Sequence, residues 1–143
     1  MKLKVFLDTN VLMDILQGGR PSSRASQTIF QAVYDGLIEA VVTSQSIIDA
    51  SYLALKAGNA EKFFAAVGSW CNHLNSEQIT SFDILWALKH FSGDFEDDAQ
   101  VSRALDSFCD VFITSDRKLL KSYADRYEDL RFMSPEEFVA GLG

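Results

Sequence analysis

The sequence predicts an α/β domain in which a mostly parallel sheet is flanked by helices in three layers. Short, almost continuously apolar runs alternate with longer segments whose apolar residues recur every three or four positions. Parallel strands are covered on both faces, so they require such continuous hydrophobicity. Alternation of strands and helices along a chain is typical of parallel α/β sheets. The length of 143 residues predicts one domain over residues 1–143.

Five segments have the composition of strands. They are residues 3–8, 39–43, 78–81, 111–114 and 130–132. The segment at 111–114 (VFIT) is the richest in strand-forming residues, and the segment at 78–81 is the weakest of the set. We therefore expect a sheet of four or five short strands.

Helical periodicity with recognisable ends marks five further segments. They are residues 22–35, 46–57, 60–72, 96–108 and a short segment that begins at Ser134. Gly36 and Gly58 follow the first two segments, where glycine commonly ends a helix. At the last segment, Ser134, Pro135 and Glu137 form a capping box with proline in the first helical position.

The charge balance limits the partners that the chain can hold. Twenty acidic and thirteen basic side chains give a net charge of −7, which argues against a broad basic face for nucleic acid. An enzyme that touches phosphates through a few cations or a bound metal is still allowed. The longest apolar runs are five residues, against the ~20 that span a bilayer, and no signal-like stretch opens the chain. We therefore expect a cytoplasmic protein with no membrane partner.

Carboxylates follow several of the predicted strands. Asp8 ends the first strand, Asp49 lies in the helix after the second, residues 94–98 (DFEDD) open another helix, and Asp116 follows residues 111–114. Each acid alone is explained by helix capping. Their convergence at one sheet edge is not, because two carboxylates ~4 Å apart repel by about 1–4 kcal/mol. A divalent cation relieves that repulsion, and ligands that are oxygen alone favour Mg²⁺ or Mn²⁺.

Four segments together resemble the PIN domain family. They are residues 8–14 (DTNVLMD), 94–97 (DFED), 111–116 (VFITSD) and 134–138 (SPEEF). The resemblance extends over essentially the whole chain, in length and in the order of elements. It implies a metal-dependent ribonuclease built on a Rossmann-like parallel sheet. Many small members of this family are toxins of toxin–antitoxin pairs, and many form homodimers.

The resemblance also assigns roles to individual acids. Asp8, Asp97 and Asp116 match the first, third and fourth acids of the family, and would hold Mg²⁺ or Mn²⁺. The second acid is normally a glutamate, and Asp49, one methylene shorter, is the nearest match. Spacing to the following strand favours Asp97 over its neighbour Asp98.

Residues beside these acids are candidates for positioning and for substrate contact. Thr9 and Asn10 would orient Asp8 by hydrogen bonds, and Thr114 would steady Asp116. Their alternative is ordinary turn and cap chemistry. Cations near the proposed edge are Arg20, Arg24, Arg117, Lys118 and Lys121. Of these, the last three are our candidates for contact with the RNA phosphates.

The resulting hypothesis is a ribonuclease toxin that acts on RNA, pairs with a small basic antitoxin and forms a homodimer. The alternative is a catalytically weak or inactive PIN-like module that binds RNA or a partner protein. A receiver domain is disfavoured because Asp8 is a single acid after the first strand, and a dinucleotide enzyme because no glycine-rich loop follows it. The aromatic residues of the middle segments would pack in the core or form an interface: Phe63, Phe64, Trp70, Trp86 and Phe91.

Overall fold

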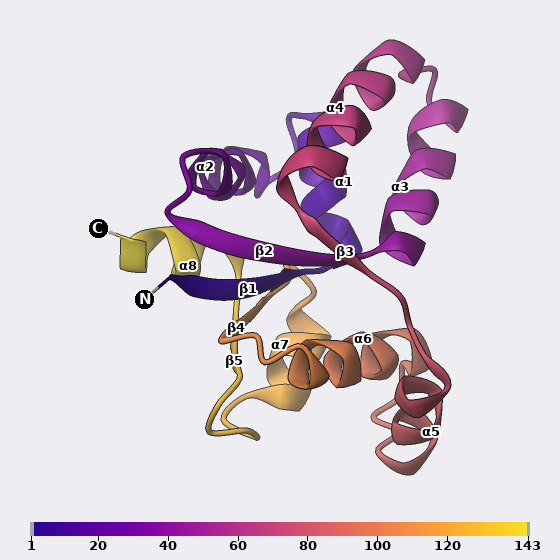
Figure 1. The fold of residues 1–143 in the computed structure, drawn as a ribbon, viewed down its shortest axis with the longest axis vertical. Helices are drawn as coiled ribbons and strands as arrows, with labels where there is room; N and C mark the ends of the chain where they lie inside the picture. The colour runs from indigo at the N-terminus through magenta and orange to yellow at the C-terminus, as the bar shows by residue number, and fades with distance from the viewer. Residues whose placement is uncertain (1, 143) are drawn as a thin grey trace.

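A computed structural model describes residues 2–142 and contains a five-stranded parallel sheet (Figure 1). The strand order is β3-β2-β1-β4-β5, and all four pairings between neighbouring strands are parallel. The strands are β1 (Leu3–Leu7), β2 (Ile38–Thr43), β3 (Asn75–Glu77), β4 (Val111–Ile113) and β5 (Arg131–Met133). The predicted α/β fold with a parallel sheet is confirmed.

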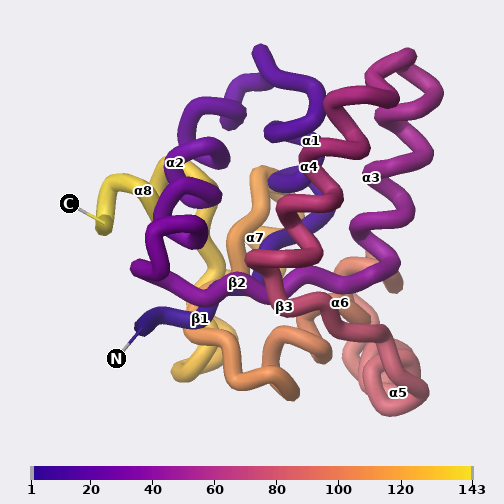
Figure 2. The backbone as a smooth tube through the Cα atoms, turned by 45° about the horizontal axis from the view of Figure 1, so that its top comes forward, coloured from indigo at the N-terminus to yellow at the C-terminus, as the bar shows by residue number. Residues whose placement is uncertain are grey.

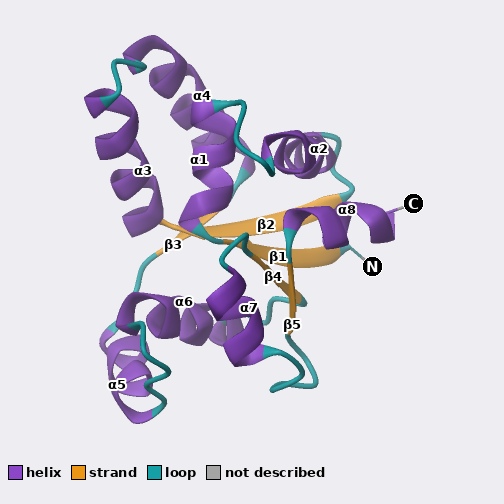
Figure 3. Cartoon of the chain, turned by 180° about the vertical axis from the view of Figure 1, so that it is seen from behind, coloured by secondary structure: helices purple, strands orange, loops and turns teal. Residues whose placement is uncertain are grey.

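Helices cover both faces of this sheet. They are α1 (Thr9–Gln17), α2 (Ser23–Tyr34), α3 (Ser44–Lys56), α4 (Ala60–His73), α5 (Ser81–Lys89), α6 (Phe95–Asp106), α7 (Arg117–Tyr123) and α8 (Pro135–Leu142). Helices α1 to α4 lie on one side of the sheet, whereas α6 and α7 lie on the other, with α5 packed against α6 (Figures 1 and 3). Helices α3 and α4 run side by side, as both the ribbon and the tube show (Figure 2).

Alternate strand residues enter two separate hydrophobic cores. Val5 and Leu7 belong to the cluster under α1 to α4, and Phe6 belongs to the cluster under α6 and α7. Phe6 stacks on Phe112 of the neighbouring strand with ring centroids 5.0 Å apart, and Phe112 lies 5.3 Å from Phe132. Because successive strand side chains point to opposite faces, one short apolar run supplies both cores.

The weakest predicted strand is wrong by three residues. The third strand is Asn75–Glu77 rather than 78–81, and Ser81 instead begins α5. Thr80 caps that helix, because its hydroxyl accepts from the Asp83 amide while the Asp83 carboxylate accepts from the Thr80 amide. The predicted set of five helices also omits α1, α5 and α7. Within residues 2–142, no helix is both long and apolar enough to cross a membrane.

The middle aromatic residues divide between core and surface. Phe63 and Trp70 of α4 are buried, whereas Phe64 on the same helix and Phe91 are exposed. Helix α3 also turns large apolar residues outward, since its buried positions are small: Ser46, Ala50 and Ala54. The core explanation is confirmed for Phe63 and Trp70, and the interface explanation stays a prediction for Phe64 and Phe91.

Trp70→Ala should lower the free energy of unfolding by about 3–5 kcal/mol, because Trp70 is 0 % exposed and packs against Phe30. Phe64→Ala on the same helix is the matched control. Phe64 is 67 % exposed, so its loss should change stability by about 0.5 kcal/mol or less. Urea denaturation measures both values, and equal losses would contradict the described packing of α4.

Candidate active site

Two of the predicted acids begin helices at the carboxyl ends of neighbouring strands. Asp8 follows β1 and caps α1, accepting a hydrogen bond from the Thr9 amide at 2.7 Å. Asp116 follows β4 and caps α7, accepting from the amides of Lys118 at 2.9 Å and Leu119 at 3.3 Å. Strands β1 and β4 are paired neighbours in the sheet. Asp8 and Asp116 therefore both cap helices and lie at the same edge of the sheet.

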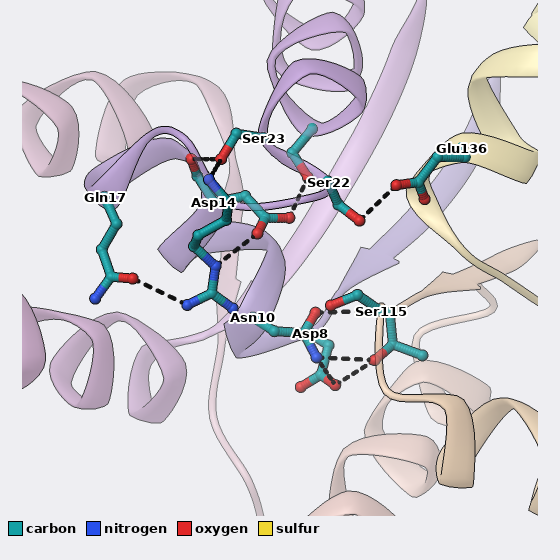
Figure 4. A network of polar contacts seen from close by, with 11 residues as sticks. Asp8, Asn10, Asp14, Gln17, Ser22, Ser23, Ser115 and Glu136 are labelled. Carbon is teal, nitrogen blue, oxygen red and sulfur yellow. Dashed lines mark hydrogen bonds and ion pairs between the residues drawn. The ribbon is translucent and has the colours of Figure 1, made fainter.

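A polar network fixes the Asp8 carboxylate (Figure 4). The Thr114 hydroxyl donates to Asp8 Oδ2 at 2.7 Å, and Asn10 Nδ2 donates to the same oxygen at 3.2 Å. Thr114 Oγ1 also accepts from the Asp116 amide at 3.0 Å, so one hydroxyl contacts both acids. The Asn10 side-chain oxygen accepts from the Ser115 amide at 3.2 Å. This arrangement orients the oxygen atoms of Asp8 toward the start of α7.

Thr9 has a different contact from the one we predict for its side chain. Its hydroxyl donates to the Ser46 hydroxyl of α3 at 2.7 Å, and only its backbone amide contacts Asp8. Ser46 in turn accepts from the Thr43 hydroxyl at 3.0 Å. The Thr9 side chain therefore ties the start of α1 to the start of α3.

The third acid comes from the first turn of α6. Asp94 caps this helix by accepting from the Asp97 amide at 3.0 Å, and Asp97 follows in the first turn. The pKa of Asp97 is raised to about 8, mainly by burial and additionally by the negative charges of Asp8, Asp94, Asp116 and Glu96. Asp97 is thus brought into the field of both strand-end acids.

The pKa of Asp8 is raised by the same kinds of cause as that of Asp97. The Asp8 pKa is raised to about 6: burial is the main cause, hydrogen bonds from Thr114 and Thr9 oppose the rise, and the charges of Asp116 and Glu96 add to it. Burial and like charges both favour the protonated form of a carboxyl group. The fold therefore gathers carboxylates that destabilise one another when ionised.

Asp98 points away from this cluster. It is fully buried and accepts from the Ser92 amide at 2.8 Å, from the Ser92 hydroxyl at 2.5 Å and from the Tyr123 hydroxyl. These bonds join the loop before α6 to α7. Of the two neighbouring acids, the structure brings Asp97 and not Asp98 to Asp8 and Asp116.

The structure places Asp49 at the margin of the site. Its carboxylate accepts from Gln45 at 2.9 Å and lines a cavity of about 280 Å³ together with Glu96. The charge of Asp49 contributes to a raised pKa of Glu96, after the larger effect of burial, but it is not among the charges that act on Asp8 or Asp97. Glu96 is the acid that our residue assignment misses, although the run of acids at 94–98 is a signal for it.

The predicted phosphate-binding cations face two different cavities. Lys118 and Lys121 line a cavity of about 410 Å³ that also contains Asp97 and Asp116. Arg117 lines a larger one, of about 910 Å³, together with Arg20. Arg24 is exposed on α2 and lines neither cavity.

The donor chemistry of the cluster suits a divalent cation. All its ligand atoms are carboxylate oxygens, which Mg²⁺ and Mn²⁺ prefer, and a cation would favour the ionised form of Asp8 and Asp97 against the burial and the like charges that raise their pKa. Among the described residues, no three His, Cys, Asp or Glu side chains approach closely enough to bind one ion in common. Mg²⁺ commonly binds through one or two protein carboxylates and completes its shell with water.

Comparisons with known proteins agree with this architecture. A family model described as a PIN domain matches residues 4–118. Comparison with curated proteins gives no significant match.

Among solved structures, the chain is similar to VapC20 of Mycobacterium tuberculosis, described as a sarcin–ricin loop cleaving toxin. The two are 10% identical, the match covers 80% of this chain and 92% of that one, and the TM-score is 0.64. A toxin–antitoxin complex from Klebsiella pneumoniae is 17% identical over 88% of this chain and 94% of that one, with a TM-score of 0.63. VapBC2 from Rickettsia felis, bound to a DNA fragment from its promoter, is 13% identical over 92% and 98%, also with a TM-score of 0.63. These likenesses show a shared fold.

Asp97→Asn should raise the melting temperature of the metal-free protein by about 2–4 °C, because the folded state opposes ionisation of the Asp97 carboxyl, first through burial and then through neighbouring negative charges, and asparagine has no such group to ionise. Mg²⁺ should stabilise the wild-type protein more than the variant. Thermal denaturation with and without a chelator measures both effects. Glu128→Gln, at an exposed acid outside the cluster, is the control, and an equal response of both variants would contradict the described repulsion.

Tyr123→Phe should destabilise the fold by about 1–2 kcal/mol, because the buried Asp98 carboxylate loses a donor. Tyr34→Phe removes a partly exposed hydroxyl instead and should cost little. Urea denaturation compares the two variants. A loss no greater for Tyr123→Phe than for Tyr34→Phe would argue against the contact between α6 and α7.

Proposed function

The chain belongs to the PIN domain family, and from this we propose that it is a divalent-metal-dependent ribonuclease that hydrolyses RNA phosphodiester bonds. We further propose that it is the toxin of a toxin–antitoxin pair. The convergence of Asp8, Asp97 and Asp116 at one sheet edge is the observation that carries the proposal. Structural similarity to a toxin that cleaves the sarcin–ricin loop supports the choice of RNA as substrate.

Repulsion is what makes the convergence informative. Helix capping needs one acid per helix and gains nothing from bringing Asp8, Asp97 and Asp116 together. The fold nevertheless holds Asp8 in place with donors from Thr114 and Asn10, and ties α6 to α7 through buried Asp98. A site that binds a cation explains why the fold brings mutually repelling carboxylates together and why additional hydrogen bonds hold them in place.

In the proposed mechanism Asp8, Asp97 and Asp116 would hold Mg²⁺ or Mn²⁺, one or two of them by direct contact and the remainder through water. The bound ion would lower the pKa of a water molecule and stabilise charge on the phosphate during hydrolysis. Asn10 and Thr114 keep the Asp8 oxygens oriented, because both donate to Oδ2. Asp49 would belong to the catalytic set at longer range, through its neighbour Glu96.

Substrate phosphates would approach through the cavity that Asp97 and Asp116 line. Lys118 and Lys121 border this cavity of about 410 Å³ and supply positive charge beside the acids. The net charge of −7 implies few further phosphate contacts, so the salt dependence of RNA binding should be modest. Substrate positioning therefore depends on a small number of cations.

The proposed partners are a small basic antitoxin and a second copy of this chain. A cation from the antitoxin would neutralise the carboxylate cluster in place of the metal. Two of the structurally similar proteins are toxin–antitoxin assemblies. For the homodimer, large exposed side chains lie on α3 and α5 at the β3 edge of the sheet (Figures 1 and 3): Ile48, Tyr52, Phe82, Leu85 and Leu88. An RNA substrate and such an antitoxin imply a cytoplasmic location.

The second candidate is a PIN-like module that binds RNA or a partner protein without cleaving it. The position of Asp49 favours this candidate, since it is not a glutamate and its charge acts on Glu96 rather than on the three converging acids. Cleavage and binding assays on the same preparation separate the two functions.

RNA of mixed sequence should be cleaved only when Mg²⁺ or Mn²⁺ is present, and Asp8→Asn should lower the rate by about 100-fold or more. Asparagine still caps a helix, so the variant should fold. Glu128→Gln should retain wild-type activity. Equal cleavage by the wild type and Asp8→Asn would contradict the proposed site, and metal-independent cleavage would contradict the proposed cofactor. RNA binding without any cleavage would favour the second candidate.

A further inference from the structure

The loop between α1 and α2 holds Arg20 in a defined position. Arg20 Nε donates to Asp14 Oδ1 at 2.9 Å, and Arg20 Nη1 donates to Gln17 at 3.1 Å. The Asp14 carboxylate is buried and accepts a further bond from the Ser26 hydroxyl at 2.6 Å. Within residues 2–142, Arg20 is the only cation paired with Asp14. A guanidinium held along one edge in this way keeps its remaining donors for another partner.

The backbone of this loop is shaped to return Arg20 to α1. Gly18 and Gly19 both have positive φ, 61° and 66°, a conformation that other residues adopt at a cost. Ser23 then accepts from the Arg20 amide at 3.0 Å and donates to the Asp14 carbonyl at 2.9 Å. The loop therefore carries several contacts whose common effect is to fix one arginine.

Arg20 lines a cavity of about 910 Å³, which lies between the α1–α2 loop, α7 and the start of α8. Arg117 lines the same cavity and takes part in none of the four ion pairs found within residues 2–142. Ser115, another lining residue, donates its amide to Asn10, which contacts Asp8 (Figure 4). The cavity thus begins next to the carboxylate cluster.

The acids that line this cavity are already engaged. Asp14 pairs with Arg20, and Glu136 accepts from the Ser22 hydroxyl at 2.5 Å, which joins α8 to the start of α2 (Figure 4). Glu137 accepts from the Ser134 amide at 3.1 Å, within its own helix cap. Among the described lining residues, the guanidinium groups of Arg20 and Arg117 and the hydroxyl groups of Ser115 and Ser134 have donors left for a ligand.

Consecutive residues after β4 alternate between two cavities. Asp116 and Lys118 line the smaller cavity, which also contains Asp97, whereas Ser115 and Arg117 line the larger one. A single RNA strand that crosses the acids therefore meets cations on both sides of the cleaved bond. Arginine binds phosphate through its planar fork, and hydroxyl groups suit the ribose 2′-OH.

We propose that the larger cavity binds a ribonucleotide of the substrate strand next to the cleaved bond, and that Arg20 and Arg117 contact its phosphodiester. This inference rests on the proposed action on RNA and adds a subsite to it. The alternative is that the pair of Arg20 and Asp14 serves only to fix the loop.

The test is the affinity for a fluorescent single-stranded RNA, measured in EDTA over a range of salt concentrations so that binding is observed without cleavage. Arg117→Ala should weaken binding by about fivefold to tenfold and lower the salt slope by about one. Arg131→Ala is the matched control. Arg131 is exposed at the amino end of β5, whereas the acids follow the carboxyl ends of the strands, so this variant should change affinity less than about twofold. Arg20→Lys keeps the charge beside Asp14 but loses the fork, and should weaken binding while the melting temperature is retained.

Glu136→Gln is a variant for which we expect tighter rather than weaker RNA binding. The amide oxygen can still accept from Ser22, while the loss of a negative charge should tighten RNA binding by about twofold to fivefold. Equal effects of Arg117→Ala and Arg131→Ala, or an unchanged affinity of Glu136→Gln, would overturn the subsite.

Cleavage assays on the same variants separate this inference from the proposed function. If substitution of Arg20 and Arg117 leaves RNA affinity unchanged while the protein still cleaves RNA with metal, the subsite is overturned and the proposed nuclease activity is supported. The expected arginine effects in a protein that cleaves nothing would support the subsite and contradict the nuclease. Absence of RNA binding by the wild-type protein in EDTA would overturn the subsite, whereas absence of cleavage in the presence of Mg²⁺ or Mn²⁺ would contradict the nuclease.

Discussion

The burial of neighbouring carboxylates at the carboxyl edge of the sheet is the constraint on which the proposed site depends. Parallel pairing of β1 with β4 brings Asp8 and Asp116 to one edge, and α6 adds Asp97. Burial strengthens the repulsion, because it removes the water that would screen the charges. The surrounding residues can be understood as the means of holding these groups together until a cation neutralises them.

Two kinds of contact resist that repulsion. Hydrogen bonds from Thr114 and Asn10 fix the Asp8 oxygens, and the bond from Tyr123 to Asp98 fixes α6 against α7. Beneath them, alternate strand residues fill hydrophobic cores on both faces of the sheet. The strain at the edge is therefore local, whereas the support comes from the whole domain, as is common where function opposes stability.

Much of this architecture could be predicted from the sequence, because buried parallel strands and helix caps leave strong local patterns. Strands β1, β2 and β4 are apolar runs followed by polar caps, and Asp8 and Asp116 lie where those patterns place them. Strand β3 is three polar residues at the edge of the sheet, Asn75–Glu77, so hydrophobicity could not reveal it. Its position depends on pairing with β2, which is a tertiary contact.

In the site, too, some features could be predicted from the sequence and others depend on tertiary contacts. Spacing favours Asp97 over Asp98, and the two side chains do lie in different surroundings, because neighbouring helical residues point in different directions and Asp98 contacts Ser92 and Tyr123. The distance of Asp49 from the three acids, the part played by Glu96 and the engagement of Arg20 by Asp14 depend on how helices pack. No local pattern records those contacts. The two cavities on either side of Asp116 likewise arise only when α7 and α8 are in place.

The central claim is that Asp8, Asp97 and Asp116 together form a cation site. Anomalous diffraction from crystals of the protein soaked in Mn²⁺ tests it most directly, because the signal locates the ion without reference to any activity. The account predicts a peak within direct coordination distance of Asp8 and at least one of the other two carboxylates. A Mn²⁺ peak bound elsewhere, or no peak at this edge at saturating Mn²⁺, would contradict it.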